Sequence, residues 1–213
     1  MDFYDLYVKW SSDRKQASLE DQKLQELLQE SEYTTQVLNY SVYGDQLPSL
    51  GDLSLPKRVT IKQNIQYNLS KVETLNNYDL VSARPQTAAD FEFCCGCTHV
   101  DLISLRLHEP LGFHLRNDCI DQALRLGIMF EMCYASSIRD TNSRRFFVSN
   151  SAKLISTTAS RNIVISSGTK DFYDQRAPYD VVNLGSVLGL TLDQSHKAIT
   201  QNPKLALEHR KDQ

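Results

Sequence analysis

Three arginines, Arg139, Arg144 and Arg145, lie close together where the sequence predicts a helix starting near Ser143. The first turn of a helix is the positive end of its dipole, so an exposed cation there forfeits on the order of 0.3 to 1 kcal/mol. A bound anion would reverse that sign, because unpaired backbone N–H groups and guanidinium forks both suit phosphate. The sequence therefore predicts a phosphate site. One alternative stays open, in which the arginines pair with Asp140 or with carboxylates across a loop.

Basic residues continue beyond this cluster. Between residues 139 and 176 there are seven Lys or Arg against three Asp, although the whole chain has a formal net charge of −3. Such segregation is typical of a protein that offers one basic face to phosphate and other faces to protein neighbours. The candidate phosphate-binding residues are Arg139, Arg144, Arg145, Lys153, Arg161, Lys170 and Arg176.

Two short apolar runs, residues 128–134 and 162–166, flank the predicted helix. Runs of this kind are typical of parallel strands that are covered on both faces. The strand, helix and strand form a βαβ unit, which indicates α/β architecture. Apolar residues at helical spacing predict the helix face that packs on the sheet. They are Val148, Ala152, Ile155 and Ala159.

Strand and helix signals alternate along the rest of the chain as well. The predicted strands cover residues 3–8, 35–42, 58–62, 78–83 and 100–105. The predicted helices cover residues 19–29 and 116–126, residues 44–57 are predicted to form a loop, and residues 64–77 stay unassigned. This alternation allows either a small TIM-type barrel or a doubly wound open sheet, and periodicity does not choose between them.

The C-terminal region carries a helix start signal. Thr191 and Gln194 form a capping-box pattern, and Pro203 predicts the end of the helix that it opens. Because 213 residues with 41% hydrophobic content suffice for one core, we expect a single domain over residues 1–207. The polar residues 208–213 are expected to fray.

Composition limits where the protein works. No apolar run approaches the roughly 20 residues that span a bilayer, so we expect no membrane contact. The N-terminus lacks the layout of a secretory signal, and five cysteines fit a reducing compartment better than a disulfide framework. We therefore expect an intracellular protein.

Two further groups of residues suggest chemistry. Cys94, Cys95, Cys97 and His99 include a C-x-x-C spacing, but a zinc site usually needs a second paired cluster, so we expect packing and no bound metal. Glu131 lies in an otherwise apolar strand. We interpret it as a buried acid paired to an arginine rather than as a general base.

Three motifs in order carry a more specific signal. The runs YASSIRDTNSRRFFVSN, NIVISSG and RAPYDVVNLGSVLGL resemble the thirty-kilodalton protein subunit of ribonuclease P, of the eukaryotic and archaeal type, which is shared with ribonuclease MRP. The similarity is strongest over residues 130–190, continues upstream through THVDLISL, YDLVSARP and RVTI, and is weaker at FYDLYVKW. The resemblance implies a TIM-like barrel related in fold to the polymerase and histidinol phosphatase superfamily. The sequence shows no eighth strand signal, so we expect an irregular or missing eighth strand.

The resemblance also implies a function. The chain would be a non-catalytic, RNA-binding subunit of ribonuclease P and ribonuclease MRP, and the basic residues above would contact RNA. In ribonuclease P, the RNA and its Mg²⁺ remove the 5′ leader from precursor tRNA, so this chain is expected to bind no cofactor. In ribonuclease MRP the role would be rRNA processing. The implied partners are the RNA and other protein subunits, including a small ferredoxin-like one, in the nucleus and nucleolus.

The alternative is a metal-dependent phosphoesterase of the polymerase and histidinol phosphatase type. Those enzymes carry an H-x-H pair at the end of the first strand, where this sequence has Asp5, Leu6 and Tyr7. Without imidazoles there, a polynuclear metal site loses its anchor. A third possibility is a protein scaffold that does not touch RNA.

Overall fold

The computed structural model describes residues 2–9, 31–45, 47, 55–169 and 172–211. The predicted helix at residues 19–29, much of the predicted loop at residues 44–57, and Lys170 lie outside the described residues.

Seven parallel strands form one sheet, and their spatial order follows the sequence. They are β1 (Tyr4–Lys9), β2 (Thr35–Val42), β3 (Lys57–Ile61), β4 (Leu80–Ala83), β5 (Leu102–Ser104), β6 (Met129–Cys133) and β7 (Ile163–Ser166). All seven predicted strands are present, and their ends differ from the predicted ones by at most two residues.

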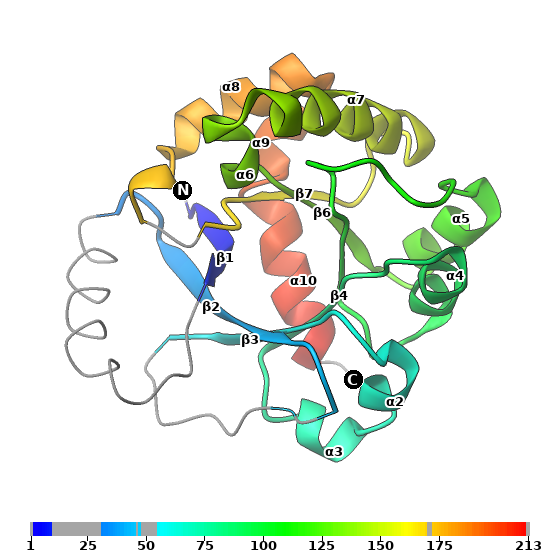
Figure 1. Ribbon diagram of the computed structural model, residues 1–213. Helices are drawn as coiled ribbons and strands as arrows, with labels where there is room; N and C mark the ends of the chain where they lie inside the picture. The colour runs from blue at the N-terminus through cyan, green and yellow to red at the C-terminus, as the bar shows by residue number, and fades with distance from the viewer. Residues whose placement is uncertain (1, 10–30, 46, 48–54, 170–171, 212–213) are drawn as a thin grey trace.

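The sheet curls into a nearly closed barrel (Figure 1). Its two edges meet through the segment after β7, where the Gly168 N–H donates to the Tyr7 carbonyl at 3.2 Å. The Lys9 N–H donates to the Thr169 carbonyl at 3.0 Å, and Val8 and Thr169 form an isolated parallel bridge. The described residues contain no eighth strand, so closure is irregular, as the missing eighth strand signal in the sequence predicted.

Helices surround the barrel (Figure 1). They are α2 (Ile65–Leu69), α3 (Val72–Leu75), α4 (Ala88–Gly96), α5 (Asn117–Arg125), α6 (Ala135–Arg139), α7 (Thr141–Thr157), the 3-10 helix η1 (Phe172–Asp174), α8 (Pro178–Leu188), α9 (Leu192–Lys197) and α10 (Gln201–Lys211). The previously unassigned residues 64–77 thus form the two short helices α2 and α3.

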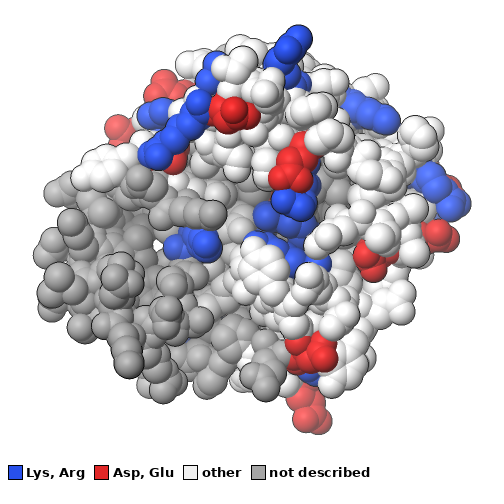
Figure 2. Space-filling model, viewed as in Figure 1, with Lys and Arg blue, Asp and Glu red and all other residues white. Residues whose placement is uncertain are grey.

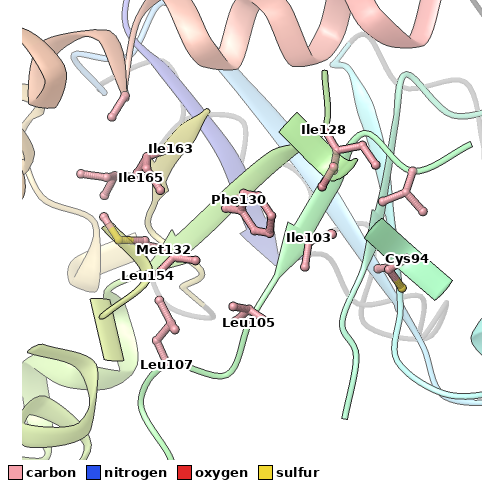
Figure 3. Close-up of a cluster of buried hydrophobic side chains, with 14 of the residues drawn as sticks. Cys94, Ile103, Leu105, Leu107, Ile128, Phe130, Met132, Leu154, Ile163 and Ile165 are labelled. Atoms are coloured by element: carbon pink, nitrogen blue, oxygen red, sulfur yellow. The ribbon is translucent and has the colours of Figure 1, made fainter. Parts of the chain in front are cut away.

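Successive residues of each strand face opposite sides of the barrel wall. The outward residues, such as Ile103 and Phe130, belong to a large apolar core that includes Cys94 of α4 and Leu154 of α7 (Figure 3). A separate apolar cluster joins the inward residues to α10. It contains Leu6, Val37, Leu80, Leu102, Met129, Val164 and Ala206.

Helix α10 closes the end of the barrel at which the strands begin. The Asn202 amide donates to the Ile163 carbonyl at 2.7 Å, at the start of β7. The His209 ring nitrogen Nδ1 lies 2.8 Å from the Asp101 carboxylate, just before β5. With this end sealed, the cavity inside the barrel can open only at the carboxyl ends of the strands.

Two predictions for the C-terminus are wrong. The capping box at Thr191 is present, but the helix it opens ends at Lys197, and Pro203 belongs to the next helix. A proline fits there because the first four N–H groups of a helix have no intrahelical acceptor. The predicted frayed tail is helical through Lys211, since its Arg210 is buried and donates to Asn76.

The predicted packing face of α7 also needs correction. The buried residues are Phe147, Ser151, Leu154 and Ile155. Of the predicted residues only Ile155 belongs to this face, while Val148 is 42% exposed. The true face starts one position earlier, which rotates it by about 100°. The apolar periodicity of this face is interrupted in the sequence by Ser151, which is buried although its side chain is polar.

Candidate nucleic-acid interface

The loops that follow β6 and β7 meet at the carboxyl rim of the barrel, which is where functional residues of such barrels gather. Arg139, the last residue of α6, donates from Nε to the Asp174 carboxylate of η1 at 2.9 Å. Its side chain remains 64% exposed. The open alternative of pairing across a loop is therefore correct for Arg139.

Arg144 turns back toward α6. Its guanidinium donates to the carbonyls of Ser137 at 3.0 Å and Ile138 at 2.6 Å. These carbonyls lie at the end of α6, where backbone acceptors lack helical partners and a cation is favoured. Arg144 thus supplies hydrogen-bond donors to the free carbonyls of α6. This explains a cation in the first turn of α7 without any bound phosphate.

The start of α7 already has an anion of its own. Asp140 is the N-cap, and its carboxylate accepts from the Ser143 N–H at 2.6 Å. That backbone hydrogen bond is the main reason why the pKa of Asp140 lies below its ordinary value. The predicted phosphate seat on the helix N–H groups is therefore occupied in part by the chain itself.

Arg145 and Arg176 are the rim cations best placed to meet a partner. Both are exposed, and no ion pair between described residues involves either one. The backbone at Arg176 is fixed on both sides. Its N–H donates to the Tyr134 hydroxyl at 2.9 Å, and its carbonyl accepts from the Tyr33 hydroxyl at 3.0 Å.

The structure does not bring all predicted residues together. Lys153 lies further along α7, and Arg161 lies beyond its far end, next to the amino end of β7. A helix of 17 residues is about 25 Å long, so Arg161 cannot share a contact with the rim. Arg161 instead lies 3.6 Å from Asp121. Figure 2 shows Lys and Arg side chains near the upper edge of the molecule, where α7 and α8 lie in Figure 1.

A second basic group, which we did not predict, surrounds the mouth of the barrel. Lys9, Lys62, Arg84 and Arg106 line a cavity of about 230 Å³. Each stands at or just after the carboxyl end of a strand, a position that the predicted strands already marked. Figure 2 shows blue side chains near the centre of this face.

Below the mouth, a buried ion pair fills the barrel. Arg58 donates to both carboxylate oxygens of Glu131, at 2.5 and 2.7 Å, and both side chains are fully buried. Burial alone would raise the pKa of Glu131, but the charge and hydrogen bonds of Arg58 outweigh it and lower the pKa to about 2. The interpretation of Glu131 as a paired interior acid is confirmed.

The place of the H-x-H pair is occupied by internal hydrogen bonds. Asp5 is buried, and its carboxylate accepts from the Ser167 N–H at 3.0 Å and from the Gln175 amide at 2.6 Å. Cys94 and Cys95 are fully buried, and burial raises the pKa of both thiols, which disfavours the thiolate that a metal requires. Over the described residues, no group of three or more His, Cys, Asp or Glu could hold a metal ion.

The family model described as RNase P subunit p30 matches residues 2–213. The chain belongs to this family. Over 132 residues it is 32% identical to ribonuclease P protein subunit p30 of Mus musculus, which covers 62% of this chain and 49% of the mouse protein. It is 27% identical to the probable ribonuclease P protein subunit 3 of Schizosaccharomyces pombe, over 97% of this chain and 93% of that protein.

A solved structure agrees on the fold of this RNase P subunit p30 family member. One chain of a cryo-EM structure of archaeal ribonuclease P with mature tRNA superposes with a TM-score of 0.70 at 15% identity. The match covers 98% of this chain and 91% of that chain. The TIM-like barrel implied by the resemblance is thereby confirmed. The chain spans less than half the length of several relatives that it matches, the mouse protein among them.

Proposed function

We propose that this RNase P subunit p30 family member is a non-catalytic subunit that binds the RNA of ribonuclease P through the carboxyl rim of its barrel. Arg139, Arg145 and Arg176 are the primary phosphate contacts, and Lys153 is an outer contact along α7. The observation that carries the proposal is the exposure of these cations on α6, on α7 and just before α8, in the segments that follow β6 and β7. Phosphate contacts supply most of the sequence-independent affinity of RNA-binding proteins.

The rim presents these charges on a rigid frame. Tyr33 and Tyr134 hold the backbone of Arg176, and Arg144 holds the end of α6 that carries Arg139. The Arg139 side chain is 64% exposed although its partner Asp174 is only 15% exposed, so the guanidinium stays accessible to a phosphate while it is paired. Arg144 supports the rim rather than contacting RNA.

The wider role follows the family. The RNA and its Mg²⁺ carry out 5′-leader removal from precursor tRNA, while this chain binds no cofactor and supports the RNA together with other protein subunits, including a small ferredoxin-like one. A role in ribonuclease MRP is supported by the name of one yeast relative, ribonuclease P/MRP protein subunit RPP1. In ribonuclease MRP the chain would serve rRNA processing. Such a subunit would work in the nucleus and nucleolus.

The test compares RNA affinity and salt dependence for two matched triple variants. Replacing Arg139, Arg145 and Arg176 by Ala should weaken binding to RNase P RNA. It should also reduce the slope of log affinity against log salt by roughly 2 to 3, since each lost contact removes about 0.7 to 0.9. Melting temperature should stay unchanged because the three side chains are exposed.

The control removes the same charge elsewhere, from Arg125, Lys197 and Lys204, which are exposed on α5, α9 and α10. The control should keep the affinity and salt slope of the wild-type protein. Equal affinity and slope for the rim variant and the control would refute the proposed interface.

A further inference from the structure

The mouth of the barrel is a small basic cavity that the proposed rim contact does not use. Lys9 ends β1, Lys62 follows β3 and Arg84 follows β4, so three strands of the wall each place a cation at the same opening. Tyr7 and Tyr43 complete this side of the cavity. We call this set of five residues the basic mouth.

The charges of the basic mouth are not neutralised by the part of the chain that the structure describes. None of its ion pairs involves Lys9, Lys62 or Arg84. Arg106, on the far side of the cavity, has its own partner in Glu109 at 2.7 Å. Half-buried cations that face one another without an anion oppose folding, so such a group favours a bound counter-ion.

The hydrogen bonds at Lys62 show how the basic mouth manages its charge. The Lys62 ammonium donates to the Tyr43 hydroxyl at 2.8 Å, which lowers the pKa of Tyr43. Burial is the main factor that lowers the pKa of Lys62, and the positive charges of Arg84 and Lys9 act in the same direction. Lys62 thus lies near two other cations, and its hydrogen-bond partner Tyr43 is neutral. A bound anion would reduce the repulsion among these cations.

Arg84 is held in place before any ligand arrives. Its Nε donates to the Ser104 carbonyl at 3.2 Å and one terminal nitrogen donates to the Ser104 hydroxyl at 2.9 Å. Its guanidinium also lies 5.5 Å from the centre of the Tyr7 ring, whose contact with Arg58 measures 4.6 Å. The other terminal nitrogen of Arg84 has no hydrogen-bond partner among the described residues. A guanidinium fixed in this way needs little reorganisation to bind an oxyanion.

The cavity is closed below and small. Tyr7 lines the cavity and contacts the buried Arg58, which pairs with Glu131, and α10 seals the amino end of the barrel. Its volume of about 230 Å³ lies below the roughly 300 to 1,000 Å³ of pockets for drug-sized ligands. A polynucleotide cannot pass through a cavity that is closed at one end. A phosphate inside an RNA strand could enter only together with the two nucleotides that it joins. A phosphate at the end of a strand or on a small molecule enters alone.

We propose that the basic mouth binds one terminal phosphate group, a phosphate monoester, between Lys9, Lys62 and Arg84. A monoester carries about −1.5 to −2 charges at neutral pH and presents three acceptor oxygens, whereas a phosphodiester carries one charge. Three converging cations match the former better. This site is independent of the RNA contact proposed at the rim. The end of an RNA strand and a mononucleotide both carry such a phosphate.

The first experiment measures binding of inorganic phosphate and of adenosine 5′-monophosphate to the full chain by calorimetry. We expect saturable binding on the order of millimolar or tighter. Replacing Lys9 and Lys62 together by Met should weaken both affinities at least about tenfold, because the methionines keep the stems and lose the charges. The lysines are chosen because Arg84 also holds Ser104, so its removal could disturb β5.

Two controls separate this site from other effects. The variant Lys197→Met with Lys204→Met makes the same charge change on α9 and α10 and should bind phosphate like the wild-type protein. The rim variant that lacks Arg139, Arg145 and Arg176 should also bind phosphate normally, so loss of the rim function would not be mistaken for loss of this site. Equal phosphate affinity in the wild-type protein and the Lys9→Met, Lys62→Met variant would overturn the proposal.

The second experiment identifies the source of the phosphate. Two short oligoribonucleotides of one sequence, with a 5′-phosphate or a 5′-hydroxyl, compete against adenosine 5′-monophosphate. Stronger competition by the phosphorylated strand, lost in the Lys9→Met, Lys62→Met variant, supports an RNA end as the ligand. Competition by neither strand, with mononucleotide binding intact, supports a small phosphate ester. Equal competition by both strands would contradict the preference for a terminal phosphate.

Discussion

Arg58 and Glu131 face each other inside the barrel, between the apolar cluster at α10 and the basic mouth. The guanidinium also donates to the Leu6 carbonyl and to the hydroxyls of Ser82 and Thr60, so its polar atoms are satisfied. The sequence could predict that Glu131 needs an arginine, because an acid in a buried strand must be compensated. It could not name Arg58, which lies 73 residues away and is brought opposite only by barrel closure.

Glu131→Gln should be strongly destabilising. Removing one partner of a buried pair leaves the other charge uncompensated and typically costs about 3 to 5 kcal/mol. The pKa of Glu131 is about 2 in the folded protein, against about 4.3 in an unfolded chain. The stabilisation by the wild-type pair is therefore complete above pH 4.3 and is lost as pH falls toward 2. Urea unfolding at pH 7 and at pH 3 measures both effects.

The double variant Arg58→Met, Glu131→Leu serves as the comparison. It removes both charges, so it should recover a large part of the stability that Glu131→Gln loses. If Glu131→Gln alone costs less than about 1 kcal/mol, water reaches the pair and the barrel interior is not closed as described.

The arginines at the rim show where residue-level prediction fails. The sequence correctly predicted Arg144 in the first turn of a helix. The inference that only an anion could offset its unfavourable position considered the dipole of that helix alone. The compensation comes from the carbonyls of α6, a five-residue helix with no sequence signal of its own. An arginine side chain is long enough to donate hydrogen bonds to the helix that precedes its own.

At the scale of elements, the strands were predictable and the helix faces were not. A parallel strand covered on both sides is apolar at most positions, so its apolar run indicates its ends directly. A helix face depends on a phase, and one buried serine in α7 was enough to shift it. Helix α10 was missed because a proline stops a helix from within but is accepted in the first turn.

His209 makes the docking of α10 sensitive to pH. Its hydrogen bond with Asp101 raises the pKa of His209, while partial burial opposes the shift. A group with a raised pKa in the folded state stabilises the protein fully below its unfolded pKa of about 6.5. That contribution is lost as pH rises through the folded value. We expect the unfolding free energy of the wild-type protein to fall above pH 6.5 by more than that of His209→Gln.

The matched control for this prediction is His114→Gln, which replaces an exposed histidine in the loop before α5. His114→Gln should keep the pH dependence of the wild-type protein. Identical pH profiles for the wild-type protein and His209→Gln, measured by urea unfolding from pH 6 to pH 8.5, would show that the contact with Asp101 does not hold a proton.

At the scale of the whole molecule, the alternation of strands and helices left a barrel and an open sheet equally possible. What decides between them is the contact of the segment after β7 with β1, made by backbone groups of Gly168 and Lys9 that leave no mark in composition. The family resemblance supplied the answer that periodicity could not. The basic mouth also depends on closure, because its three cations are far apart in sequence and converge only around a barrel axis.

Barrel closure determines what chemistry the mouth can support. A hydrolytic metal centre needs carboxylates or imidazoles that point into the opening, and it must attract divalent cations. Here the carboxylate of Asp5 is engaged by Ser167 and Gln175, and Glu131 is engaged by Arg58. The nearest charges in the opening are the cations Lys9, Lys62 and Arg84, which repel a second cation.

The purified chain should therefore not hydrolyse precursor tRNA or simple phosphate esters when Mg²⁺, Mn²⁺ or Zn²⁺ is added. The assay follows product release over a range of metal concentrations, with the Asp5→Asn variant measured beside the wild-type protein. Asp5→Asn is the informative variant because Asp5 lies where the alternative of a metal-dependent phosphoesterase would require the first metal ligands. Any trace of turnover from a contaminating nuclease would persist unchanged in Asp5→Asn and would diminish on repurification. Metal-dependent turnover that survives repurification and disappears in a folded Asp5→Asn variant would mean that the mouth opens to metals and that the chain is an enzyme.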